Sequence, residues 1–175
     1  MSRLLLIVGM PGCGKGEFIS IAKDFGYVPI VMGDIVREET LRRGRDIKES
    51  GMIAQQLRIE MGNSAVAQLT IPKIEEGKKY IIDGIRGYSE VQEFKSYFDT
   101  IVVAIHSSPV ARFSRLCGRG RGDDPLDPEE FFERDHRELG FGIGDAIALS
   151  DVMIINEDGL EDFRSDIAKV IRKLD

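Results

Sequence analysis

The chain has few of the residues and patterns that would identify a secreted, metal-binding or membrane protein. Its 175 residues include two cysteines, Cys13 and Cys117, and two histidines, which give neither a disulfide framework nor the spacing of a metal site. No apolar run approaches the roughly 20 residues needed to span a bilayer. The opening stretch, MSRLLLIVG, is too short for a signal peptide. We therefore expect a cytoplasmic protein that does not bind membranes.

The chain also lacks an excess of positive charge. Lys and Arg number 24 and Asp and Glu number 30, for a net charge of −6 at pH 7. Proteins that bind nucleic acid through a general basic face carry the opposite balance. The composition therefore argues against a nucleic-acid partner, and any anion site must be built from local clusters. Neither a Ser–His–Asp nor a Cys–His arrangement is visible, and there is no internal repeat or linker.

What the chain does have is an alternation of apolar segments and helical patterns in a length suited to one domain. Strands are predicted at residues 4–8, 26–31, 80–84, 100–105 and 152–155, and helical patterns between the second and third of them cover residues 48–61 and 65–76. This order predicts a three-layer α/β fold, a five-stranded parallel sheet with helices on both faces. Pro29 lacks an N–H donor and indicates that the second strand lies at an edge.

The first predicted strand runs into a glycine-rich segment, GMPGCGKG, at residues 9–16. Gly9, Gly14 and Lys15 fit G-x-x-x-x-G-K, the phosphate-binding loop or P-loop. Glycines let several backbone N–H groups turn toward one anion, and the helix predicted to follow adds the positive end of its dipole. We predict that the phosphates of a nucleotide are bound by Gly9, Met10, Pro11, Gly12, Cys13, Gly14, Lys15, Gly16 and Glu17.

The two residues after Lys15 are unexpected in this loop. Where the pattern has a Ser or Thr that reaches Mg²⁺, the chain has Gly16, followed by Glu17. A carboxylate at the mouth of a phosphate site should repel the ligand unless it turns away or helps to hold the metal. Cys13 is interpreted as a small filler. The dinucleotide-binding motif G-x-G-x-x-G is not present, because its third glycine would fall at Glu17. The alternative to a phosphate-binding loop is a glycine-rich turn that binds no ligand.

Polar residues follow the predicted strands where a parallel sheet collects its ligands, at the carboxyl ends. Asp83 ends the third strand and is predicted to organise Mg²⁺, with a capping role as the alternative. Asp34 follows the second strand and is as well suited to capping a helix. Arg37 and Arg86 each lie three residues after one of these aspartates, so both can overhang one cleft. A guanidinium there can bind the phosphate of an acceptor.

Arginines gather around a glycine-rich segment at residues 118–125. They are Arg112, Arg115, Arg119, Arg121, Arg134 and Arg137. We interpret residues 118–138 as a lid that closes over polyphosphate, with two or three of these arginines contacting the ligand and the others forming salt bridges with nearby acids. Ordinary solvated surface charge is the alternative.

Taken together, these segments resemble nucleoside monophosphate kinases of the adenylate kinase type. Residues 9–16 are similar to that family's G-x-P-G-x-G-K-G, residues 33–37 to its G-D-x-x-R, residues 83–86 to a shortened D-G-x-P-R and residues 121–124 to its lid motif R-x-D-D. The resemblance implies that Asp34, Arg37 and Arg86 bind the acceptor in a helical region at about residues 33–64. It implies that Lys15, Arg119, Arg121 and Arg134 are catalytic. Glu17 departs from the family's threonine.

Residues 150–161, SDVMIINEDGLE, resemble instead the ending of dephospho-CoA kinases, which implies that Asn156 lies beside the donor adenine. The whole chain is identified as a member of a small archaeal family of adenylate-kinase-related, dephospho-CoA-kinase-like proteins of unsettled substrate. The implied activity is phosphate transfer from ATP, with Mg²⁺, to AMP or a related monophosphate. Dephospho-CoA is the other acceptor considered, with Asp34 as the base.

Two other functions are considered. The first is a nucleotide sensor or assembly ATPase with slow turnover, motivated by Glu17 and by the shortened segment at residues 83–86. The second, a nucleic-acid end kinase, is opposed by the acidic balance. The sequence leaves the acceptor, the donor base and the oligomeric state open.

Overall fold

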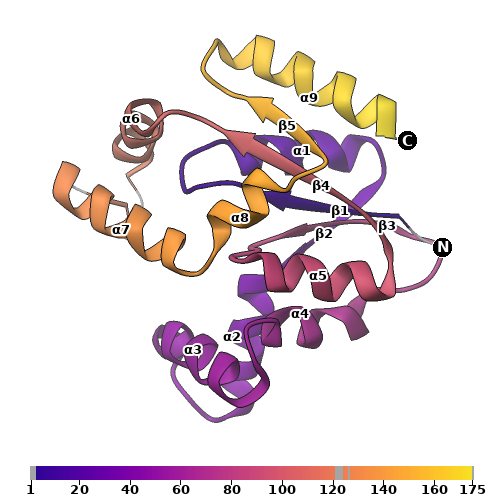
Figure 1. Ribbon diagram of the computed structural model, residues 1–175, viewed down its shortest axis with the longest axis vertical. Helices are drawn as coiled ribbons and strands as arrows, with labels where there is room; N and C mark the ends of the chain where they lie inside the picture. Colours follow the sequence, from indigo (N-terminus) through magenta and orange to yellow (C-terminus); the bar gives the residue numbers. More distant parts are fainter. Residues whose placement is uncertain (1–2, 121–123, 126, 175) are drawn as a thin grey trace.

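A computed structural model describes residues 3–120, 124–125 and 127–174 of the chain. Its centre is a sheet of parallel strands in the order β2-β3-β1-β4-β5. The strands are β1 Arg3–Val8, β2 Tyr27–Val31, β3 Lys79–Asp83, β4 Asp99–His106 and β5 Val152–Ile155. Helices cover both faces of the sheet (Figure 1), which confirms the predicted fold class.

Each predicted strand is present within two residues of its expected bounds. β2 lies at an edge of the sheet, next to β3, as Pro29 indicated. At an edge, one side of the strand needs no hydrogen-bond donor, so a proline is tolerated there.

The helices run from α1 to α9 along the chain. Their bounds are α1 Lys15–Asp24, α2 Met32–Arg42, α3 Ser50–Met61, α4 Ala65–Thr70, α5 Tyr88–Tyr97, α6 Pro109–Arg119, α7 Pro128–Gly140, α8 Ile143–Ala148 and α9 Leu160–Leu174, with short 3-10 helices at Ile47–Glu49 and Ile71–Lys73. The helix predicted for residues 65–76 is shorter than expected. It ends at Thr70 because Pro72 cannot continue an α-helix and restricts the residue before it.

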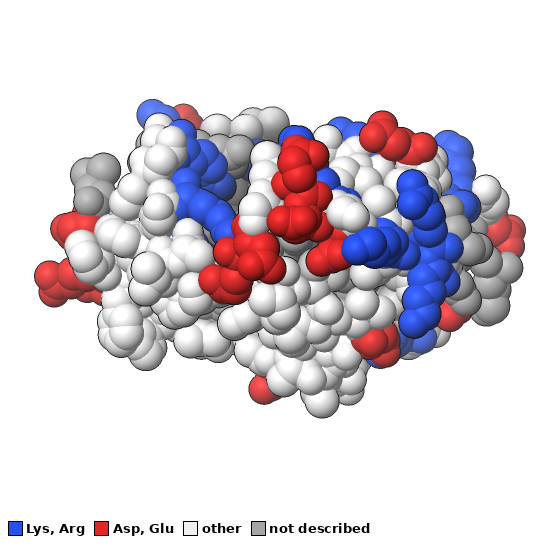
Figure 2. Space-filling model, turned by 90° about the horizontal axis from the view of Figure 1, so that it is seen from above, with Lys and Arg blue, Asp and Glu red and all other residues white. Residues whose placement is uncertain are grey.

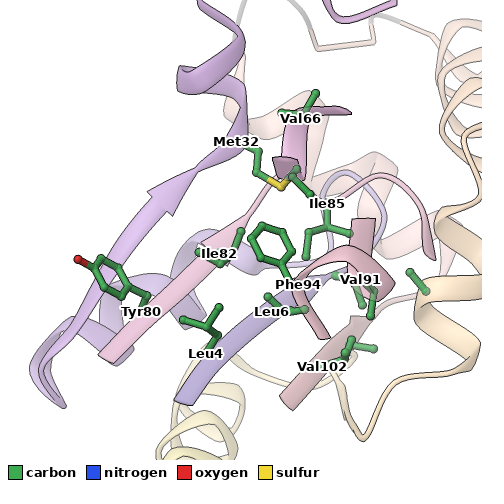
Figure 3. Close-up of a cluster of buried hydrophobic side chains, with 14 of the residues drawn as sticks. Leu4, Leu6, Met32, Val66, Tyr80, Ile82, Ile85, Val91, Phe94 and Val102 are labelled. Atoms are coloured by element: carbon green, nitrogen blue, oxygen red, sulfur yellow. The ribbon is translucent and has the colours of Figure 1, made fainter. Parts of the chain in front are cut away.

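The core lies in two layers, one on each face of the sheet, because successive residues of β1 point to opposite faces. Leu4 and Leu6 belong to the layer beneath α5, whose Phe94 is fully buried (Figure 3). Leu5 and Ile7 belong to the other layer, which includes Phe18 of α1 and residues of α9. Because both faces of β1 are covered, each residue from Leu4 to Val8 is apolar and buried.

This arrangement decides where a ligand can bind. The parallel strands end at one edge of the sheet, and β1 lies between β3 and β4. The loop that follows β1 is therefore at the centre of that edge, with the ends of β3 on one side and of β4 and β5 on the other.

A buried carboxylate joins α2 to α3. Glu39 is 8% exposed and accepts hydrogen bonds from Arg42 Nε at 2.6 Å and from Arg43 Nε at 2.7 Å. Arg43 also donates to Glu60 of α3 at 2.9 Å. These bonds, the one from Arg42 first, lower the pKa of Glu39 from an ordinary 4.5 to about 2.

We predict that this network contributes stability that is lost in acid. A carboxyl whose pKa is lowered by folding stabilises the protein above its unfolded pKa of 4.5, and this contribution disappears as the pH falls toward 2. Glu39→Gln should lower the free energy of unfolding at pH 7 by about 1–2 kcal/mol and flatten its pH dependence between pH 4.5 and 2. Urea denaturation at several pH values measures both effects. Glu38→Gln, which removes an exposed ion pair with Lys73, is the control. Equal stability of the two variants would contradict the assignment.

Candidate functional site

A cleft of about 670 Å³ opens at the carboxyl ends of the strands. This volume is typical of a small-molecule site. The predicted site residues that line it are Gly9, Pro11, Gly12, Gly14, Lys15, Gly16, Glu17, Asp83, Arg86, Arg119, Arg134 and Asn156. Segments far apart in the sequence thus meet around the loop after β1. The face seen from above in Figure 2 carries both acidic and basic side chains.

The loop backbone needs glycine at positions where other residues would clash. Gly14 has φ 110°, and a Cβ there would lie 2.6 Å from Asn156 Nδ2 and 2.9 Å from a ring carbon of Phe163. Gly12 has φ 83°, and its Cβ would lie 2.9 Å from the carbonyl oxygen of Arg112. Close contact with α6 on one side and with α9 on the other therefore determines the path of the loop.

Lys15, the first residue of α1, turns back over the loop. Its Nζ donates to the carbonyl oxygen of Gly9 at 2.6 Å and lies 3.5 Å from that of Met10. Cys13 is 1% exposed, as expected of a small filler, and its backbone N–H donates to Met10. The lysine charge is thus held inside the concave loop, where a phosphate would need it.

Asn156, which follows β5, holds the loop by its side chain. Asn156 Nδ2 donates to the carbonyl oxygen of Cys13 at 2.9 Å. The Asn156 carbonyl oxygen accepts from Ser107 Oγ at 2.7 Å and from Arg115 Nη2 at 2.8 Å. The resemblance placed Asn156 beside a donor adenine. It lines the cleft, but its amide nitrogen bonds the loop.

Arg112, one of the arginines that the sequence placed around the predicted lid, forms a second support of the loop. It is 3% exposed and pairs with Asp135 of α7, with one bond at 2.8 Å. The same guanidinium donates to the carbonyl oxygens of Pro11 and Ser107, both at 3.2 Å. Arg112 is therefore one of the salt-bridging arginines expected near the lid, and it joins α7 to the loop.

Asp83 ends β3 and lines the cleft. Its Oδ1 is buried and has no hydrogen-bond partner in the part of the chain that the structure describes. Within the same residues, no group of three or more His, Cys, Asp or Glu side chains could hold a metal ion. A carboxylate with one unsatisfied oxygen fits Mg²⁺, which keeps several waters and is usually bound by one or two carboxylates together with substrate phosphates.

Two arginines of the predicted lid contact one acid. Arg119 Nε donates to Asp124 at 2.9 Å, and Arg134 Nη1 lies 3.6 Å from the same carboxylate, which is 8% exposed. Both arginines line the cleft. Arg121 lies outside the described residues.

The residues predicted to bind the phosphate acceptor do not all line the cleft. Arg86 lines the cleft and lies 3.6 Å from Glu138 of α7. Asp34 and Arg37 form an exposed ion pair at 2.6 Å within α2. Neither is among the described residues that line the cleft. Asp34 lies inside the first turn of α2 and not at a strand end, because the helix begins already at Met32.

A smaller pocket of about 100 Å³ adjoins the cleft at Arg86. Arg58 and Arg86 lie 5.2 and 5.3 Å from the ring centroid of Phe141. Glu90 is 1% exposed, accepts from the backbone N–H of Arg86 at 2.7 Å and lies 3.7 Å from Arg58. Burial raises the pKa of Glu90 and lowers that of Arg58. The sequence offered no motif for this pocket.

The structure also accounts for Glu17. Its Oε1 accepts a hydrogen bond from Arg164 Nε of α9 at 2.5 Å, and Arg164 Nη1 donates to Glu161 at 2.7 Å. The expected repulsion between Glu17 and a phosphate is therefore offset by a cation that lies far away in the sequence. Hydrogen bonds to Glu17 and then Glu161 raise the pKa of Arg164.

We predict opposite outcomes for two glycine substitutions in this segment. Gly14→Ala places a methyl group within 2.6 Å of Asn156 at a positive φ, and should lower the free energy of unfolding by about 1–3 kcal/mol. Gly16→Ala meets nothing within 4 Å, and should leave stability unchanged or slightly higher because alanine favours the helix. Thermal unfolding measures both. Equal stability of the two variants would show that the close approach at Gly14 does not determine the loop.

The chain is similar to proteins of known sequence over nearly its whole length. A family model described as an AAA domain matches residues 8–131. A UPF0200 protein from Thermococcus sibiricus is 46% identical over 98% of this chain and 95% of its own. A UPF0200 protein from Methanopyrus kandleri is 49% identical over 98% of this chain and 90% of its own.

Solved structures share the fold at low identity. TT1252 from Thermus thermophilus has a TM-score of 0.69 at 16% identity, and a dephospho-CoA kinase from Campylobacter jejuni has 0.61 at 18%. Each alignment covers 99% of this chain and 98% of the other. A shikimate kinase from Bacteroides thetaiotaomicron has a TM-score of 0.63 at 14% identity. The fold is thus that of P-loop kinases, and the chain belongs to the UPF0200 family of AAA-domain proteins, which includes archaeal relatives.

Proposed function

We propose that the protein is an ATP-dependent phosphotransferase that acts on a small nucleotide-like acceptor. The observation that carries this proposal is the composition of the cleft. One cavity is lined by a glycine loop with Lys15, by Asp83 with its unsatisfied buried oxygen, and by Arg86, Arg119 and Arg134. Phosphoryl transfer needs these parts: a phosphate cradle, an acid that organises the metal, and cations over the transferred group.

On the donor side, the loop N–H groups and Lys15 bind the β- and γ-phosphates of ATP. To do so, Lys15 leaves its bond to the carbonyl oxygen of Gly9. Asp83 holds Mg²⁺, which, when bound, neutralises part of the phosphate charge. The buried Oδ1 of Asp83, which has no partner among the described residues, supports this role, because such an atom is costly unless a ligand satisfies it.

On the acceptor side, Arg86 binds the acceptor phosphate, since it lies in the cleft wall between the loop and the small pocket. The small pocket, which shares Arg86 with the cleft, brings Arg58 to the same end. Residues 33–64 form the acceptor region of one domain in this proposal. Arg37 keeps its place in that region as a prediction, because its exposed pair with Asp34 lies beyond the cleft lining in the described structure.

The reaction transfers the γ-phosphoryl group in line. An oxygen of the acceptor bonds to the γ-phosphorus while the bond to the bridging β–γ oxygen breaks, and ADP leaves. Arg119 and Arg134, released from Asp124, offset the charge that develops, and Arg121 is proposed for the same role. Residues 118–138 act as the lid.

The geometry favours a phosphate over a hydroxyl as the acceptor group. A phosphate needs no general base, whereas a hydroxyl does. Asp34, the candidate base, is exposed, bonded to Arg37 and away from the cleft. AMP or a related monophosphate is therefore the preferred acceptor, and dephospho-CoA is second.

A nucleotide sensor with slow turnover is the second candidate. It is favoured by the pairing of Arg119 and Arg134 with Asp124, which keeps two cations engaged by protein until a ligand displaces the acid. Tight ATP binding with a burst of at most one turnover would support this function over the kinase.

We predict that the protein transfers phosphate from ATP in the presence of Mg²⁺ to at least one member of a panel of nucleoside monophosphates and dephospho-CoA. Lys15→Ala should lower the rate at least a hundredfold, because the loop then lacks its only full positive charge. Coupled ADP release and product chromatography measure transfer. Lys23→Ala, on the exposed side of α1, is the control. Failure with every acceptor, or equal rates for Lys15→Ala and wild type, would refute the kinase.

A second prediction concerns the metal. Asp83→Asn should raise the Mg²⁺ concentration needed for half-maximal transfer about tenfold or more, because the neutral amide is a weaker ligand. The dissociation constant of ATP without Mg²⁺ should stay the same or fall, since a negative charge near the phosphates is removed. Mg²⁺ titrations of activity and calorimetric binding of ATP test both. Asp24→Asn, exposed at the end of α1, is the control. An unchanged Mg²⁺ requirement would make Asp83 a structural residue.

A further inference from the structure

The proposed cleft has two unlike ends, and the order of the strands separates them. On the β3 side of the loop, its wall contains Asp83 and Arg86. On the β5 side, its wall contains Asp158, Leu160 and Phe163. If the acceptor occupies the β3 side, the nucleoside part of the donor extends over the β5 side.

Glu17 belongs to the β5 side. It lies in the first turn of α1, two residues after Lys15, and lines the cleft. Its bond to Arg164 of α9 draws it toward the helix that follows β5. In a P-loop the lysine reaches the β- and γ-phosphates, and the loop N–H groups reach the α- and β-phosphates. Glu17 lines the same cleft on the side of α9, which is the end left for the nucleoside part of the donor.

The two oxygens of Glu17 differ. Oε1 is held by Arg164 at 2.5 Å, and Arg164 is itself held by Glu161 at 2.7 Å. Oε2 makes no hydrogen bond to any residue that the structure describes. The side chain is 28% exposed. One oxygen thus orients the carboxylate, and the other is an available acceptor at the cleft wall.

A carboxylate in this place would repel phosphate, and its pair with Arg164 offsets that repulsion. It can, however, accept charge-assisted hydrogen bonds from neutral hydroxyl groups. Acidic residues bind the ribose of dinucleotides in this way. Stability does not explain the pair, because an ion pair this exposed contributes little to folding.

We infer that Glu17 recognises a ribose hydroxyl of the phosphate donor, and that the protein therefore selects ribonucleoside over deoxyribonucleoside triphosphates. This inference rests on the proposed function for the location of the donor. Arg164 is the positioning residue, because it fixes the carboxylate without lining the cleft.

The test compares ATP with 2′-deoxyATP and 3′-deoxyATP on the full chain. Both the dissociation constant, by calorimetry, and kcat/KM for transfer are measured. The wild type should prefer ATP over at least one deoxy donor about tenfold to a hundredfold, the worth of one charge-assisted hydrogen bond. Glu17→Ala should reduce this preference to about threefold or less. Glu161→Ala removes the other partner of Arg164 at an 83% exposed position and should keep the preference.

Each outcome decides the inference. Equal use of the three donors by the wild type, or an unchanged preference in Glu17→Ala, overturns it. A changed Mg²⁺ requirement in Glu17→Ala with the preference intact also overturns it and makes Glu17 a metal-site residue. Transfer without ribose preference refutes this inference and leaves the kinase standing. Ribose-selective binding without transfer supports the inference and refutes the kinase. Absence of ATP binding refutes both.

Discussion

The candidate site depends on the close approach of the glycine-rich loop, residues 9–16, to the segment after β5. Gly14 lies so near Asn156 and Phe163 that a Cβ would overlap them, and the amide of Asn156 holds the carbonyl of Cys13. These residues come from opposite ends of the chain. The path of the loop therefore depends on contacts with the segment after β5 and with α9, which come from the other end of the chain.

Charge in the cleft is balanced by pairs that a ligand can exchange. Lys15 lies on a backbone carbonyl, Arg119 and Arg134 share Asp124, and Glu17 is offset by Arg164. In the proposed function, a protein with a net charge of −6 would in this way present several cations to a polyphosphate without a basic surface. The proposed ligand would have to replace the partners that these cations have in its absence, so its binding free energy would be a difference between two sets of contacts.

The fold was predictable because its signals are local. Apolar runs with strand length, glycine and proline at their ends, and helical patterns between them indicated the sheet and its layers, and Pro29 indicated an edge. The loop motif indicated the central site. The error at α4 also has a local cause, since the pattern continued through Pro72 while the helix could not. The pairings of Arg112 with Asp135 and of Glu17 with Arg164 were not predictable, because many arginines and acids of this chain are equally plausible partners in sequence.

The sequence by itself determined the fold class, the glycine-rich loop with its P-loop pattern, and the set of polar residues that follow the strands. Each of these depends on neighbours in the chain, through backbone conformation and the alternation of buried positions. Only the tertiary structure decided which of those residues share a cleft. It brought Asp83 and Arg86 to the loop and left Asp34 and Arg37 outside its lining, because α2 begins at Met32 and carries both residues on its exposed surface. Contacts between distant segments depend on how the helices pack on the sheet, which no local pattern specifies.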